Sequence, residues 1–186
     1  MSQFSIVDTP FAGLKVIERR PIEDHRGFLA RIYCADQLKI AGWNNPIAQI
    51  NQTVTKKRGT IRGMHFQNPP YSEMKLVSCL RGEVWDVVVD LRKNSPTFLK
   101  WHAEKLSEEN CRALLIPEGF AHGFQTLADN CELIYLHSAP YIPEAEAGIH
   151  SNDPMLAISW PLDLIEISTR DAEHPLLDEQ FIGIQL

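Results

Sequence analysis

Residues 83–91 read EVWDVVVDL and carry the clearest strand signal in the chain. The residues at odd positions from 85 to 91 are all apolar, whereas the even positions include the carboxylates Asp86 and Asp90. Alternation with a period of two predicts a β-strand that has two chemically different faces. The stretch KLVSCL at 75–80 predicts a second strand, and Arg81-Gly82 predicts the tight turn of a hairpin between the two.

Short apolar segments of the same kind continue on both sides, punctuated by 12 prolines and 10 glycines. Strands are expected at 47–55, 60–67, 113–116, 123–126 and 132–138, with weaker signals at 3–17 and 28–34. Helices are expected to be short, at 34–41, at 168–173 and from the cap-like sequence Ser107-Glu108-Glu109-Asn110 onward. The pattern predicts an all-β chain, a sandwich or barrel with a few short peripheral helices.

The composition is that of an ordinary globular protein, and we expect a single domain over residues 1–186. The chain has 186 residues, of which 44% are hydrophobic and 23% charged, and its net charge is −6. This acidic balance argues against a general nucleic-acid binder, which usually has a basic face. No apolar run approaches the roughly 18 residues of a membrane-spanning helix, and the first twenty residues lack a signal-peptide pattern. We expect a cytoplasmic protein with neither nucleic acid nor membrane as a partner.

Three segments combine ionisable residues with glycine, which permits close approach of a ligand to the backbone. They are DHRGF at 24–28, RGMHFQ at 62–67 and IPEGFAHGF at 116–124. His65 fits either a core histidine or a general base, because an imidazole titrates near pH 6.5 and its surroundings can tune it. For His122 the structural and the functional interpretations are balanced. The remaining histidines are expected at the surface or in loops: His25, His102, His137, His150 and His174.

Lys75 and Tyr135 also have two interpretations each. Lys75 stands at the entrance of an apolar strand, where a lysine is usually solvated but can instead point into the mouth of a barrel. Tyr135 lies within the strand segment LIYLH, where a packed aromatic side chain is the commoner role.

Several familiar catalytic and cofactor-binding motifs are absent from the sequence. A metal-binding barrel of this size would show an HxH pair, but Gly63 and Gln67 stand on either side of His65 where the second histidine would be, and no HExxH occurs. The four cysteines form no CxxC pair, and there is no GxSxG, GxGxxG or P-loop. The sequence predicts a protein that needs no metal and no cofactor.

Nine ordered motifs make the chain similar to the dTDP-4-dehydrorhamnose 3,5-epimerase family of nucleotide-sugar epimerases, from about Phe4 to about Leu177. They are DHRGF (24–28), QINQT (49–53), GTIRGMHFQNPP (59–70), KLVSCLRGEVWDVVVDLRKNSPTF (75–98), IPEGFAHGFQTL (116–127), ELIYLHSAPYIP (132–143), NDP (152–154), ISWP (158–161) and STRDAEHP (168–175). The resemblance implies a cupin-type jelly roll that binds no metal and works as a homodimer. It also implies inversion of C3, C5 or both in a nucleoside-diphosphate-linked 4-keto-6-deoxyhexose, a step of deoxysugar biosynthesis for bacterial polysaccharides.

Residue by residue, the resemblance implies catalytic roles for four side chains. His65 aligns with the general base, and Asp171 with the carboxylate that pairs with it. Tyr135 aligns with the tyrosine proposed to return a proton on the opposite face, and Lys75 with a lysine close to the developing C4 oxyanion. The other matches surround the nucleotide and the sugar as substrate-binding residues: Arg26, Gln49, Asn51, Arg62, His122 and Tyr141.

The chain departs from the family's pattern in the run that follows Gly27. Leu29 stands where a phenylalanine is common, and Arg31 where a glutamate is common. A glutamate can accept a hydrogen bond from the thymine ring N–H, whereas arginine only donates and suits a base that presents acceptors, such as cytosine. Arg31 is therefore a further candidate substrate-binding residue, and the sequence leaves the nucleotide open between dTDP and another one.

Two other functions remain open on the sequence alone. A 3,4-ketoisomerase acts on similar substrates and also passes through an enediol. A non-catalytic cupin that binds sugar nucleotides would need no base and acid on opposite faces of its ligand. An epimerase is the main expectation, because all four catalytic matches are present.

Overall fold

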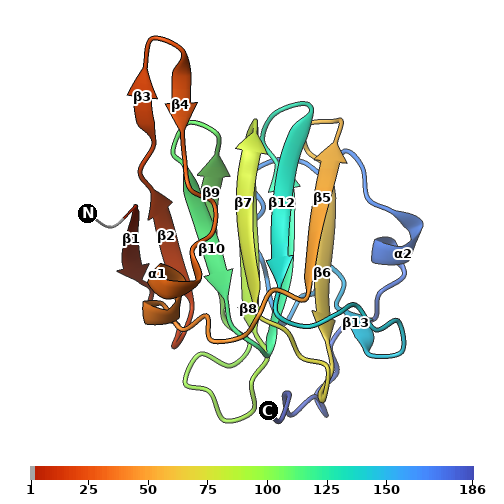
Figure 1. Cartoon of the computed structure of the whole chain (residues 1–186). Helices are drawn as coiled ribbons and strands as arrows, with labels where there is room; N and C mark the ends of the chain where they lie inside the picture. Colours follow the sequence, from red (N-terminus) through yellow and green to blue (C-terminus); the bar gives the residue numbers. More distant parts are fainter. Residues whose placement is uncertain (1–2) are drawn as a thin grey trace.

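Two antiparallel β-sheets make up most of the structure, a computed structural model that describes residues 3–186 (Figure 1). The six-stranded sheet has the order β1-β2-β10-β7-β12-β5, the five-stranded sheet has the order β13-β6-β11-β8-β9, and β3 and β4 form a separate hairpin. The predicted all-β class with a few short helices is confirmed. The elements are β1 (Phe4–Asp8), β2 (Lys15–Arg19), β3 (Ile22–Asp24), β4 (Gly27–Leu29), α1 (Ala35–Ile40), β5 (Gln49–Thr55), β6 (Ile61–Gln67), β7 (Lys75–Arg81), β8 (Glu83–Asp90), β9 (Trp101–Ser107), β10 (Arg112–Ile116), β11 (Phe120–Thr126), β12 (Cys131–His137), β13 (Glu146–Gly148) and α2 (Thr169–Ala172).

The strand predicted at 83–91 is β8, and the one predicted at 75–80 is β7, but the two do not form a hairpin. β7 pairs with β10 and β12, whereas β8 pairs with β9 and β11 of the other sheet. The turn at Arg81-Gly82 therefore carries the chain from one layer to the other. Gly82 has a φ of +76°, and a β-carbon there would stand 2.9 Å from Sγ of Cys131. Glycine is required at this corner.

Three other local expectations are wrong or incomplete. Residues Ser107 to Asn110 form a tight turn between β9 and β10 rather than the start of a helix, and the two side chains bond each other's backbone N–H groups at 3.0 and 3.1 Å. The weak signal at 3–17 is divided between β1 and β2, and the one at 28–34 contributes only the end of β4. The short helices predicted at 34–41 and 168–173 are confirmed as α1 and α2.

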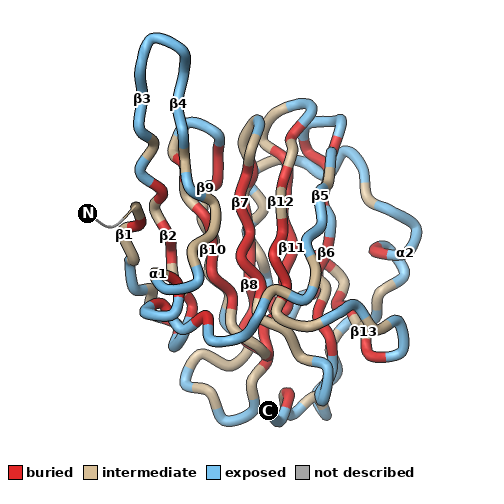
Figure 2. The backbone as a smooth tube through the Cα atoms, in the orientation of Figure 1, coloured by how far each residue is buried: buried red, intermediate tan, exposed pale blue. Residues whose placement is uncertain are grey.

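Apolar residues cover both faces of each sheet, which Figure 2 shows as buried segments along the central strands. Between the sheets, Val77 and Leu133 pack against Val84 and Val88 in one cluster. Outside the six-stranded sheet, Leu38 of α1 and Trp43 cover Leu76, Leu115 and Leu136. Outside the five-stranded sheet, the C-terminal part of the chain covers Val87, Val89 and Leu91 with Ile149, Leu156 and Ile184. Both faces of β8 are therefore buried, and its carboxylates find partners inside the protein.

Within residues 3–186, no helix is long and apolar enough to cross a membrane, since α1 has six residues and α2 has four.

Candidate active site

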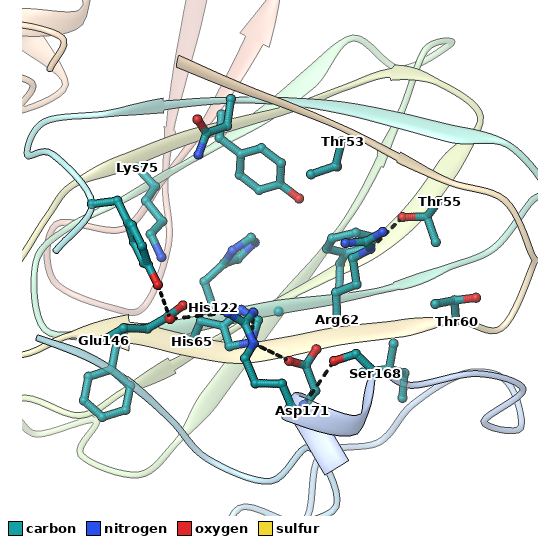
Figure 3. A pocket seen from close by; sticks show the side chains of 18 of the residues that line it. Thr53, Thr55, Thr60, Arg62, His65, Lys75, His122, Glu146, Ser168 and Asp171 are labelled. Atoms are coloured by element: carbon teal, nitrogen blue, oxygen red, sulfur yellow. Dashed lines mark hydrogen bonds and ion pairs between the residues drawn. The ribbon is translucent and has the colours of Figure 1, made fainter. Parts of the chain in front are cut away.

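A cavity of about 890 Å³ lies between the sheets, where polar side chains take the place of hydrophobic core residues (Figure 3). β5, β7 and β12 supply one wall, β6 and β11 supply the other, and α2 lies at one side. Nine of the eleven residues singled out in the sequence line this cavity: Gln49, Asn51, Arg62, His65, Lys75, His122, Tyr135, Tyr141 and Asp171. The two that do not are Arg26 and Arg31.

His65 on β6 and Asp171 on α2 form a hydrogen-bonded pair. Nε2 of His65 lies 2.8 Å from Oδ1 of Asp171, and Oδ2 accepts a hydrogen bond from the backbone N–H of Gly63 at 3.1 Å. Burial opposes the charge of Asp171, but the hydrogen bonds and the imidazole outweigh this effect and hold the pKa of the carboxyl well below its ordinary range. The carboxylate keeps a proton on Nε2 of His65 and leaves Nδ1 free to accept another.

The cap of α2 fixes the direction of the Asp171 side chain. Ser168 is the N-cap residue, and its hydroxyl accepts a hydrogen bond from the backbone N–H of Asp171 at 3.1 Å. Such a cap satisfies a helix N–H that has no partner within the helix. The four-residue helix is thereby held with its one buried residue, Asp171, toward β6.

Two glycines explain how the RGMHF and AHG motifs come together on neighbouring strands. β6 and β11 pair antiparallel, with His65 opposite His122. A β-carbon on Gly63 would stand 2.5 Å from Cα of Gly123, and one on Gly123 would stand 2.7 Å from the carbonyl oxygen of Arg62. A larger residue at either position would separate the strands, so the two glycines hold the histidines in one wall of the cavity.

Two residues that the sequence analysis missed surround the His65–Asp171 pair. His174 lies in the loop after α2, as expected, and its ring packs against that of His65 with centroids 5.4 Å apart. Its Nε2 is buried and has no hydrogen-bond partner among the described residues. Arg170 places Nε 3.4 Å from Oδ1 of Asp171 and Nη2 3.2 Å from Nε2 of His65.

The ligand atoms of His65, Asp171 and His174 lie within 4.8 Å of one another, close enough to hold a metal ion. The guanidinium of Arg170, however, already brings a positive charge to this group. Because an arginine side chain stays protonated near neutral pH, a metal ion would have to displace the guanidinium group of Arg170.

Tyr135 reaches the cavity from β12, on the opposite sheet. Its ring lies 6.0 Å from that of His122 and 6.2 Å from that of His137, measured between centroids. Burial raises the pKa of the Tyr135 phenol above its ordinary value. The hydroxyl therefore keeps its proton at neutral pH and is able to donate it.

His122 is held by one of the two carboxylates of β8. Its Nε2 lies 2.8 Å from Oδ1 of Asp86, and both side chains are buried. The other carboxylate, Asp90, binds Arg92, Ser95 and Thr97. The alternation in EVWDVVVDL thus places Asp86 behind the cavity. It places Asp90 at the end of β8, where it binds residues of the loop that follows.

Lys75 and His137 meet at the carboxylate of Glu73. Nζ of Lys75 lies 3.1 Å from Oε1, and Nδ1 of His137 lies 2.8 Å from Oε2. His137 was expected at the surface or in a loop, and instead it is buried in the cavity wall. A period of two along β12 places it on the same face as Tyr135, and this is the signal that could have found it.

Arg26 and Arg31 lie on or next to the β3–β4 hairpin, which projects beyond the two sheets (Figure 1). Nη2 of Arg26 pairs with Oδ2 of Asp24 at 2.5 Å, and both arginines are exposed. The hairpin also exposes large apolar side chains, with Phe28 66% and Leu29 68% accessible. Within one chain, neither arginine reaches the cavity.

Comparisons with known proteins agree with the fold. The family model for dTDP-4-dehydrorhamnose 3,5-epimerase matches residues 8–179. The dTDP-4-dehydrorhamnose 3,5-epimerase of Salmonella typhimurium is 40% identical over 179 residues, which cover 95% of this chain and 97% of that protein. The dTDP-4-dehydrorhamnose 3-epimerase of Streptomyces niveus is 42% identical over 157 residues, which cover 84% of this chain and 75% of that protein.

Among solved structures, the chain is similar to the crystal structure of dTDP-6-deoxy-D-glucose-3,5-epimerase from Legionella pneumophila in complex with dTDP-4-keto-L-rhamnose. The TM-score is 0.91 at 38% identity, and the match covers 97% of this chain and 98% of that one. This likeness confirms the cupin-type fold that the sequence resemblance implies.

Proposed function

Because the chain belongs to the dTDP-4-dehydrorhamnose 3,5-epimerase family, we propose that it epimerises a nucleoside-diphosphate-linked 4-keto-6-deoxyhexose beside the ketone. The observation that carries the proposal is a paired His65 and Asp171 on one wall of the cavity and a protonated, buried Tyr135 on the other. Inversion needs a base and an acid on opposite faces of the sugar, since the proton leaves one face and returns on the other.

The first step is removal of a proton from C3 or C5. The ketone at C4 acidifies both C–H bonds, because the electron pair left behind is shared with the carbonyl oxygen as an enolate. Nδ1 of His65 takes the proton, and the negative charge of Asp171 stabilises the imidazolium that forms. A well-placed base of this kind contributes roughly 10²–10⁴-fold to the rate.

The second step returns a proton from the other wall. Lys75 supplies a fixed positive charge for the enolate oxygen, and its side chain is only 10% exposed, so water screens that charge little. The Tyr135 hydroxyl then gives its proton to the carbon on the face opposite His65. Solvent restores the proton on Tyr135 and removes the one on His65 after product leaves.

We infer that the nucleotide is dTDP, which the names of the relatives share. Arg62 and His122 line the cavity and suit a diphosphate, since guanidinium and imidazole groups donate to its oxygens. Arg31 alone favours a base that presents acceptors, and the experiment below therefore includes a CDP-linked sugar. The proposed location of the reaction is the cytoplasm.

We also propose that the active form is a homodimer in which the β3–β4 hairpin of one copy covers the cavity of the other. The exposed Phe28 and Leu29 call for an apolar partner surface, and the edge strand β5 offers one in Ile50 and Val54, which are 58% and 51% accessible. This arrangement would bring Arg26 and Arg31 toward the nucleotide. Light scattering on the purified protein gives the oligomeric state, and Phe28→Asp should yield a monomer with raised KM.

The deciding experiment is solvent exchange followed by NMR. The protein is incubated in D₂O with dTDP-4-keto-6-deoxyglucose and, separately, with its CDP-linked counterpart, and the C3 and C5 signals are recorded. We expect deuterium and inversion at both carbons of the dTDP sugar. The Streptomyces niveus relative makes a 3-epimerase the second candidate, and exchange confined to C3 would establish it.

Other outcomes would refute the proposal. Formation of a 3-keto sugar would identify a 3,4-ketoisomerase, and binding without exchange at either carbon would identify a non-catalytic sugar-nucleotide binder. Faster exchange with the CDP-linked sugar would overturn the assignment of the nucleotide.

A further inference from the structure

A continuous line of hydrogen bonds runs along the cavity wall formed by β5, β7 and β12. It begins at the backbone N–H of Tyr141, passes through four side chains and ends at the ammonium group of Lys75. The contacts are Tyr141 N to Gln49 Oε1 (3.0 Å), Gln49 Nε2 to Asn51 Oδ1 (3.1 Å), Asn51 Nδ2 to His137 Nε2 (3.4 Å), His137 Nδ1 to Glu73 Oε2 (2.8 Å) and Lys75 Nζ to Glu73 Oε1 (3.1 Å). Every member of the line borders the cavity.

The direction of each hydrogen bond follows from the first. A backbone N–H only donates, so the Gln49 amide must turn its oxygen to Tyr141 and its nitrogen to Asn51. Asn51 then has its oxygen toward Gln49 and its nitrogen toward His137. That nitrogen also only donates, so Nε2 of His137 must accept. The ring proton of His137 is left on Nδ1, directed at Glu73.

Glu73 is the anionic member of this line and joins His137 to Lys75. Burial raises the pKa of its carboxyl, but the hydrogen bond from His137 and the charge of Lys75 outweigh burial and hold the pKa below its ordinary value. The carboxylate side chain is 9% exposed, and the Lys75 side chain that it faces is 10% exposed. An ammonium group this far from water is costly to keep charged without a counter-charge.

His137 also acts on the aromatic side chain beside it. Its ring is stacked on that of Tyr135, with an interplanar angle of 23° and centroids 6.2 Å apart. Because Asn51 and Glu73 hold the two nitrogens of His137, the ring cannot turn without breaking one of these contacts. The stacking surface offered to Tyr135 is therefore fixed.

We propose that Glu73 and His137 are positioning residues of this site: Glu73 holds Lys75 charged and in place, and His137 orients Asn51 and Tyr135. The inference rests on the proposed function, which gives Lys75 and Tyr135 their roles, and on the place of Asn51 in the cavity wall. Neither Glu73 nor His137 touches the reacting atoms in this scheme. Both act through the groups that do.

The first test needs no substrate. Long-range ¹H–¹⁵N NMR of the imidazole rings near neutral pH, with the His137 signal assigned by its loss in His137→Phe, reports which nitrogen carries the proton. We expect the Nδ1–H form. The Nε2–H form, or a doubly protonated ring, would overturn the hydrogen-bond line whatever reaction the protein catalyses.

The second test uses Glu73→Gln, which keeps the shape and removes the charge. We expect kcat to fall about 10–100-fold with little change in KM, because the ammonium group of Lys75 loses the carboxylate that it pairs with at 3.1 Å. Glu104→Gln is the matched control, since Glu104 also accepts from a histidine, His102, but outside the cavity. If Glu73→Gln and Glu104→Gln both keep the kcat and KM of the wild type, Glu73 has no positioning role.

The third test uses His137→Phe, which keeps a ring against Tyr135 but offers Asn51 no acceptor. We expect KM to rise about tenfold, with a smaller effect on kcat. Circular dichroism checks both variants, and His137→Gln replaces the phenylalanine if that one does not fold. An unchanged KM would refute the role of His137. A wild-type protein that exchanges no substrate proton would refute the proposed function instead, and the tautomer measurement would still decide the hydrogen-bond line.

Discussion

The imidazole of His174 occupies the place where a side chain at position 148 would begin. A β-carbon built on Gly148 would overlap Nε2 and the neighbouring ring carbons of His174. Gly148 pairs with His65 in the β13–β6 register, and His174 packs against the ring of His65. The absence of a side chain at Gly148 thus makes room for His174 beside the His65–Asp171 pair.

This relationship predicts that Gly148→Ala harms both stability and activity. The new methyl group must push His174 toward His65 and Asp171, and overpacking of this kind costs about 1–3 kcal/mol, or roughly 2–12 °C in Tm. Calorimetry and initial rates measure the two effects. The double variant with His174→Ala should recover most of the lost Tm, and additive losses would show that the two residues do not compete for the same space.

His65→Asn should abolish proton exchange at both carbons while leaving the fold intact. We expect a loss of about 10²–10⁴-fold in kcat, because asparagine cannot accept the substrate proton. The control is His102→Asn, since His102 pairs with Glu104 on β9 away from the cavity. Exchange that persists in the His65 variant at the wild-type rate would assign the base to another residue.

Tyr135→Phe should separate exchange from inversion. The base on the other wall still forms the enolate, so deuterium from D₂O should enter the substrate, but little inverted product should appear. Product analysis by NMR after a fixed time gives both quantities. Tyr33→Phe serves as the control, because Tyr33 packs against Trp43 outside the cavity. Normal inversion by the Tyr135 variant would contradict the proposed acid.

The low pKa of Asp171 predicts a specific loss of stability in acid. The folded state holds this carboxyl deprotonated more strongly than the unfolded chain does. Its contribution is therefore complete above the ordinary carboxyl value of about 4 and is lost as the pH falls toward the lower value of the folded state. Urea unfolding from neutral pH down to about pH 3 should show a shallower pH dependence for Asp171→Asn than for the wild type. Equal slopes would show that the pair does not contribute.

Much of the fold could be predicted because a regular alternation of apolar residues identifies short strands in the sequence. β8 is the clearest example, and each of the seven strands expected between residues 47 and 138 exists. Pairing was harder to predict: β7 and β8 adjoin in sequence with a tight turn between them, yet they belong to different sheets. Each is an inner strand whose two neighbours come from distant parts of the chain, and such long-range pairing cannot be read from the residues around the turn. β9 escaped prediction because WHAEKLS mixes polar and apolar residues without a clear period.

The site was predictable where a long motif surrounds the residue, as for His65 and Asp171. The residues that were missed stand outside such runs or looked like surface positions. Glu73 precedes a strand, and His137 and His174 were expected at the surface or in loops. Their burial depends on long-range pairing, such as that of β12 with β7, which places His137 opposite Lys75. Arg26 and Arg31 are the opposite case. The sequence singles them out as substrate-binding residues, but within one chain they lie outside the cavity.

The His65–Asp171 pair joins positions 106 residues apart in the sequence. During synthesis, β6 leaves the ribosome long before α2 does, so the imidazole exists for most of that time without its carboxylate. The same C-terminal stretch supplies Ile149, Leu156 and Ile184, which cover the outer face of the five-stranded sheet. A chain that ends before Asp171 therefore lacks the complete His65–Asp171 pair and also exposes apolar strands to proteases. Activity in a crude preparation is consequently expected only from folded chains that extend past Asp171.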